Sequence, residues 1–129
     1  MKKIIVKIST PFDSDKIRLQ VNPNLLSKYN FEIDNDCDVC DFWIVWGDLP
    51  VGKEKLTVKC PERNVLYLTD EAYVDKKFDQ KFLDQFSAVI TCRNDISHRN
   101  IIKTHEINMW QLYKPFSQFN NSIPIKKEK

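Results

Sequence analysis

The 129-residue sequence predicts an α/β fold of the Rossmann-like type, a mostly parallel sheet flanked by helices. Two short apolar runs, Val65–Leu68 and Ala88–Ile90, have the length and composition of buried strands. An amphipathic stretch separates them, and two strands joined through a helix form a right-handed parallel unit in nearly every known case. A third run, Phe42–Trp46, has five consecutive large apolar residues, which indicates a central strand covered on both faces.

The elements before the central strand follow from local composition. Ile4–Ile8 is predicted to be the first strand, because it is short, apolar and rich in β-branched residues. The polar segment Thr10–Asn24 contains two prolines and is predicted to be a loop with a short helix nearby. Leu25–Tyr29 is predicted to be helical, and a short extended piece follows through Phe31 and Ile33.

The helix between the two central runs has a clear apolar side. Four large side chains recur at i, i+4, i+5 and i+8: Phe78, Phe82, Leu83 and Phe86. Asp79 is the one charge that falls on this stripe. The apolar run, the helix and the next apolar run together form the βαβ unit around which the rest of the chain is organised.

The last strand is predicted at Ile101–Ile107, at the edge of the sheet because it carries Lys103, His105 and Glu106. Met109–Tyr113 is either a strand end or a short helix. From Pro115 onward the composition is that of a linker. We therefore predict a Rossmann-like domain over residues 1–114 and a linker or tail over residues 115–129.

Composition limits the classes of function. The net charge is +2 with both signs interspersed, which argues against nucleic acid as a partner. No apolar run approaches the length of a signal peptide or a membrane span, so we expect at most peripheral association with a membrane. The four cysteines are too sparse for a secreted disulfide scaffold, which predicts a cytoplasmic protein with reduced thiols.

Glycine is scarce, and this bears on cofactors. The sequence has only Gly47 and Gly52, with neither a GxGxxG nor a Walker-type loop to hold phosphates. We expect no cofactor to be bound by this domain. A metal site is also disfavoured, because Cys37-x-x-Cys40 has no second close pair and lies in an acidic loop.

The sequence also bears on three other kinds of site: a nucleophilic triad, a phosphate-accepting aspartate and an aromatic surface for a sugar. A nucleophilic triad would need a sharp elbow such as G-x-S-x-G, which is missing. Asp13, Asp15 and Asp48 loosely follow the order of a phosphate-accepting receiver domain, although the segments between the strands are long and irregular. Trp43 and Trp46 point to opposite faces of a strand, so Trp46 either fills the core or presents a flat face to a sugar ring.

Glu71 is the strongest candidate for chemistry. It follows the Val65–Leu68 strand at the turn into the helix, and ligands of α/β sheets bind at the carboxyl ends of strands. A carboxylate there either acts as a general base or serves as a helix-start charge that interacts favourably with the helix dipole.

Four segments in the right order resemble the N-terminal domain of bacterial glycosyltransferase family ten, the α-1,3-fucosyltransferases. They are Asp41–Gly47 (DFWIVWG), Thr69–Ala72 (TDEA), Lys81–Phe86 (KFLDQF) and Arg93–Asn100 (RNDISHRN). They match the family's DF…FG strand, its T-G-E turn, its kFlxQF segment and its r-x-D-i-x-H-p-N turn. Asp70 stands where the family has glycine, and Ala72 where it has proline.

The resemblance implies one half of a GT-B architecture, in which two Rossmann-like domains face each other across a cleft. This half would bind the oligosaccharide acceptor, and a C-terminal domain outside these residues would bind the donor GDP-fucose. Glu71 matches the family's general base in an inverting transfer that requires no metal. Candidate acceptor contacts are Trp46, Tyr73, Arg93 and His98.

On this interpretation the 129 residues alone should not catalyse transfer. The alternative is a non-catalytic α/β module that binds carbohydrate or docks a partner. In that case oligosaccharide binding would need no second domain.

Overall fold

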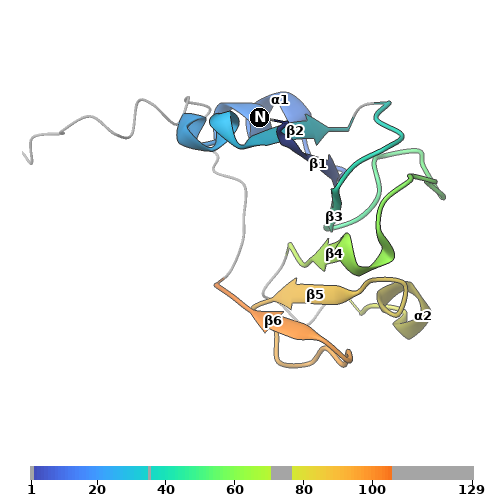
Figure 1. Cartoon of the computed structure of the whole chain (residues 1–129). Coiled ribbons are helices and arrows are strands. Elements are labelled where there is room, and N and C mark those ends of the chain that lie inside the picture. The colour runs from blue at the N-terminus through green and yellow to red at the C-terminus, as the bar shows by residue number, and fades with distance from the viewer. Residues whose placement is uncertain (1, 35, 71–76, 106–129) are drawn as a thin grey trace, which may run out of the picture.

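The computed structural model describes residues 2–34, 36–70 and 77–105. Six strands form a single sheet with all neighbours parallel, in the order β2-β1-β3-β4-β5-β6 (Figure 1). The strands are β1 (Ile4–Ser9), β2 (Tyr29–Ile33), β3 (Phe42–Trp46), β4 (Val65–Leu68), β5 (Ala88–Thr91) and β6 (Ile101–Lys103). The helices are α1 (Ser14–Leu19) and α2 (Gln80–Leu83), with 3₁₀ turns η1 (Pro23–Ser27) and η2 (Glu62–Asn64). This confirms the predicted Rossmann-like α/β class.

The strand order reverses between β1 and β3. The chain runs outward from β1 to the edge strand β2, returns to β3 on the other side of β1, and then proceeds to the opposite edge at β6. In open parallel sheets ligands bind outside the carboxyl ends of the strands, at such a reversal point. The carboxyl edge is therefore the part of the sheet that topology favours as a site.

The early helical turn lies two residues before its predicted position. Asn22 caps η1, because its side-chain oxygen accepts a hydrogen bond from the backbone N–H of Asn24 at 3.0 Å. Pro23 fits the first turn because it needs no N–H partner there. The chain is already extended at Tyr29, where β2 begins.

The predicted helix from Phe78 to Phe86 is much shorter in the structure. Its α-helical part, α2, has four residues and begins after Asp79, whose side chain accepts from the backbone N–H of Lys81 at 3.0 Å. The charge that interrupted the apolar stripe is thus the helix cap. Leu83 and Phe86 nevertheless face the core and are buried.

The last strand is also shorter than predicted. It ends at Lys103, and its place at the edge of the sheet is confirmed. The remainder of the predicted strand, from residue 106, lies outside the described residues, as does Met109–Tyr113.

The core lies on the sheet face that α2 covers. Its buried apolar residues are Val45, Tyr67, Leu83, Phe86, Val89 and Ile96. Tyr67 is completely buried at the centre, with the rings of Phe78, Phe82 and Phe86 at centroid distances of 5.6, 5.3 and 5.2 Å. Its hydroxyl donates to the carbonyl oxygen of Gly47 at 2.5 Å, which ties β4 to the end of β3.

The central strand is covered less than predicted. The position of Phe42–Trp46 in the middle of the sheet is confirmed, but only Val45 of its five residues is buried. The other four residues, which include Phe42, Ile44 and Trp46 on the face opposite to the core, are half-buried.

Candidate functional site

The carboxyl ends of β3, β4 and β5 are held level with one another. The N–H of Gly47 donates to the carbonyl of Leu68 at 2.9 Å, and the N–H of Thr69 donates to the carbonyl of Ile90 at 3.1 Å. The backbone hydrogen bonds between neighbouring strands thus continue one residue past the ends of β3 and β4. The turns that follow therefore leave the sheet from one shared edge.

Gly47 allows the β4 turn to pack against the end of β3. Its φ angle is +80°, a backbone conformation that residues with a side chain rarely adopt. A Cβ atom at this position would lie 3.1 Å from Oδ2 of Asp70. The close approach at Gly47 thus fixes Asp70, the residue before Glu71 in the sequence. Glu71 and Tyr73 themselves lie outside the described residues.

Gly47→Ala and Gly52→Ala form a matched pair that tests this packing. Both glycines have φ near +80°, but a Cβ at Gly52 would meet nothing within 4 Å. We expect Gly52→Ala to lower the free energy of unfolding by about 1–2 kcal/mol, the usual cost of this conformation for a side chain. Gly47→Ala should cost about 1–3 kcal/mol more because of the crowding against Asp70. Urea unfolding of the two variants measures the difference, and equal losses would contradict the proposed packing.

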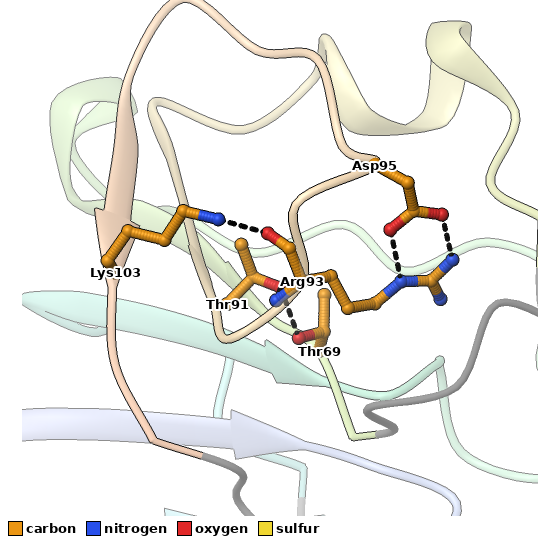
Figure 2. A network of polar contacts seen from close by, with 5 residues as sticks. All are labelled: Thr69, Thr91, Arg93, Asp95 and Lys103. Atoms are coloured by element: carbon orange, nitrogen blue, oxygen red, sulfur yellow. Dashed lines mark hydrogen bonds and ion pairs between the residues drawn. The ribbon is translucent and has the colours of Figure 1, made fainter.

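A buried hydroxyl pair links the turns after β4 and β5 (Figure 2). Oγ1 of Thr69 donates to Oγ1 of Thr91 at 2.8 Å, and the backbone N–H of Arg93 donates to the same Thr91 oxygen at 3.0 Å. Both threonines are buried. Sequence reasoning missed this pair, although each threonine directly ends an apolar strand run, which was an available signal.

Arg93 is held by its neighbours on the core side of the sheet. Its Nε and Nη2 donate to Oδ1 and Oδ2 of Asp95 at 2.8 and 2.5 Å, as Figure 2 shows. Its guanidinium carbon lies 4.9 Å from the centroid of the Phe78 ring, a stacking distance for a cation over an aromatic face. The Lys103 ammonium donates to the Arg93 carbonyl, which fixes the backbone of the turn as well.

A hollow of about 330 Å³ opens beside this pair. Polar groups line much of it: Lys77, Gln80, Arg93, Asp95 and Ser97. Phe78 supplies an aromatic surface in the same wall. Hydroxyl groups of a sugar can hydrogen-bond to such a set of donors and acceptors, while the sugar's C–H face packs on the ring.

Asp95 makes the Arg93 pair sensitive to pH. The pKa of Asp95 lies below its ordinary value of 3.8, chiefly because the Arg93 side chain hydrogen-bonds to the carboxylate. A lowered folded-state pKa contributes stability that is present above the ordinary pKa and is lost as the pH falls through the folded value. We therefore expect the wild type to be more stable to unfolding than Asp95→Asn at neutral pH. This difference in the free energy of unfolding should disappear as the pH falls below the folded pKa of Asp95. The urea midpoints of both proteins, measured across this range, test the prediction; a constant difference would contradict it.

Trp46 lies at the same edge but on the opposite face from Arg93. Its ring meets Phe12 edge-on at a centroid distance of 5.3 Å. Its Nε1 is buried and has no hydrogen-bond partner among the described residues. Trp46 thus lies at the carboxyl end of β3, near the point where the strand order reverses.

His98 lies at the opposite end of the strands from Arg93, beside the amino ends of β5 and β6. Its Nδ1 lies 3.0 Å from the backbone nitrogen of Asn100 and 3.1 Å from the Asn100 carbonyl oxygen, and its Nε2 lies 3.0 Å from the carbonyl oxygen of Phe86. These partners precede β6 and β5 and mark the amino ends of the strands. The structure therefore separates His98 from Trp46 and Arg93, and His98 links the segments that precede β5 and β6.

The acidic residues considered for phosphorylation have local structural partners. Asp13 caps α1 by accepting from the backbone N–H of Asp15 at 2.9 Å, and Asp48 is exposed and accepts from the N–H of Leu49 at 2.7 Å. Within residues 2–34, 36–70 and 77–105, no three His, Cys, Asp or Glu side chains gather as a metal site would require. This arrangement offers no acidic pocket of the receiver type.

No protein-family model, curated protein or solved structure matches this chain. The relationship to glycosyltransferase family ten therefore remains a prediction from the four motifs. Across the described part of the chain, no helix combines the length and apolar character needed to span a membrane.

Proposed function

We propose that this chain is the acceptor-binding half of an inverting glycosyltransferase, which moves fucose from GDP-fucose to a hydroxyl of an oligosaccharide. One observation carries the proposal: Thr69 and Asp70, the first two residues of the TDE motif, follow β4 at the carboxyl edge, between β3 and β5, where parallel sheets bind ligands. The alternative sites weighed from the sequence have no comparable placement.

Glu71 acts as the general base in this proposal. Its carboxylate takes the proton from the acceptor hydroxyl as that oxygen attacks the anomeric carbon of fucose. The bond from that carbon to the GDP oxygen breaks on the opposite side, so the configuration inverts. Gly47 and Thr69 position the base by fixing the first residues of its turn.

The acceptor is held by the groups around the turn. Arg93 and Asp95 present hydrogen-bonding atoms in the hollow beside β5, and Trp46 and Tyr73 supply flat apolar surfaces for the sugar rings. His98 takes no part, because both of its ring nitrogens are engaged at the amino edge. GDP-fucose binds to a second domain in this proposal, as the family resemblance implies, and the scarcity of glycine in these residues fits that division.

The transfer is tested in a protein in which residues 1–129 are joined to a donor-binding domain. With GDP-β-fucose and N-acetyllactosamine, we expect an α-linked fucoside, identified by proton NMR of the anomeric signal. A β-linked product would contradict the inverting mechanism. Saturable binding of the oligosaccharide without any transfer would favour the alternative, a non-catalytic carbohydrate-binding module.

A further inference from the structure

The sheet face opposite to the core is apolar, and it is open toward the amino ends of β2, β1 and β3. Side chains alternate along a strand, and the register places Val6 beside both Phe31 and Phe42, so all three share this face. A hollow of about 350 Å³ lies over it. It is lined only by apolar side chains among the described residues: Ile4, Val6, Tyr29, Phe31, Phe42 and Ile44.

The same apolar face continues to the other edge of the sheet. Leu66 is paired with Ile44 in the register, Ile90 with Leu68, and Ile102 with Ile90. Ile102 is 46% exposed. Toward the carboxyl ends of the strands this face is covered: Phe12 packs on Trp46, and Ile33 of β2 is buried.

An all-parallel sheet is normally covered on both faces, and an apolar surface of this extent marks a contact surface. We propose that residues 109–119 of this chain cover the open face. This segment has a single charged residue, Lys114. It carries six large apolar side chains: Met109, Trp110, Leu112, Tyr113, Phe116 and Phe119.

The segment is close enough to reach the open face. β6 ends at Lys103, and β3 lies three strands away, about 15 Å at the usual spacing of neighbouring strands. The six residues from Lys103 to Met109 span up to about 20 Å when extended. A segment tethered in this way has a local concentration on the order of millimolar, so it occupies the face in preference to a second copy at micromolar concentration.

Methyl NMR of the full chain tests the proposal. A soluble gadolinium chelate broadens exposed methyl signals, with Val51 (85% exposed) and the buried Val89 as references. We expect the methyls of Ile4 and Ile44 to be protected like Val89 in the wild type. In Trp110→Ser/Phe116→Ser their broadening should rise several-fold toward that of Val51, while Val89 stays unchanged. The control Lys126→Ser/Lys127→Ser changes the same tail and should leave both methyls protected.

Two results would overturn the proposal. One is broadening of Ile4 and Ile44 that is equal in the wild type and the double variant. The other is protection in the wild type that disappears on dilution, which would identify a second copy as the occupant. Should the double variant fail to fold, nuclear Overhauser effects in the wild type decide the question. Contacts from the rings of Trp110 and Phe116 to these methyls must be intramolecular in a mixed-label sample, and their absence refutes the proposal.

Discussion

Replacing Glu71 by glutamine is expected to lower kcat by about 100-fold or more in a protein that also carries the donor-binding domain. Glutamine keeps the shape of the side chain but cannot accept the proton of the acceptor hydroxyl at neutral pH. KM for the acceptor should change little, because the loss falls on the transition state rather than on binding. Initial rates at saturating acceptor and donor measure the effect.

Glu62→Gln is the matched control for this change. Glu62 lies in η2 before β4, exposed and at the opposite end of the strand from the TDE turn. The control should retain wild-type turnover. Near-normal turnover of the Glu71 variant would remove Glu71 from the mechanism, whatever the fold.

The largest loss of stability is expected for Tyr67→Ala. Truncating this fully buried ring removes its contacts with three phenylalanine rings and leaves a cavity, which typically costs about 3–5 kcal/mol of the free energy of unfolding. Domains of this size are stable by about 5–15 kcal/mol, so the variant should lose a large share of its free energy of unfolding. Urea denaturation followed by circular dichroism provides the measurement.

Tyr67→Phe separates the hydroxyl from the ring. It keeps the aromatic packing but removes the donor to the Gly47 carbonyl, which should cost about 1–3 kcal/mol. Val51→Ala, at an 85% exposed position, should change stability by no more than about 0.5 kcal/mol. A loss for Tyr67→Ala no larger than that for Val51→Ala would show that this ring does not organise the core.

The strands were predictable because their signal is local. Runs such as Phe42–Trp46 and Ala88–Ile90 are short, apolar and rich in strand-forming residues, and the polar residues around Lys103 correctly marked an edge. The helix around Phe82 was predicted too long, because the same apolar spacing is satisfied by a four-residue helix with irregular flanks. Asp79 carried the signal of the true helix start.

The site was predictable only in part. Thr69 and Asp70 lie at the carboxyl edge because they follow β4, and the apolar run Val65–Leu68 indicated that strand. The partners of Arg93 and His98 depend on how the loop after β5 returns across the sheet. That path is fixed by contacts between distant residues, such as His98 with the Phe86 carbonyl, and spacing along the chain does not encode it.

The central claim is that oligosaccharide binds at the carboxyl edge of β3, β4 and β5. A titration of the ¹⁵N-labelled chain with N-acetyllactosamine tests it most directly, since it needs neither the donor nor a second domain. We predict saturable amide shifts at Gly47, Asp70 and Asp95, and none at Asn64 or Asn100 beside the amino ends of the strands. Shifts confined to the amino edge, or no saturable shifts at all, would contradict the claim.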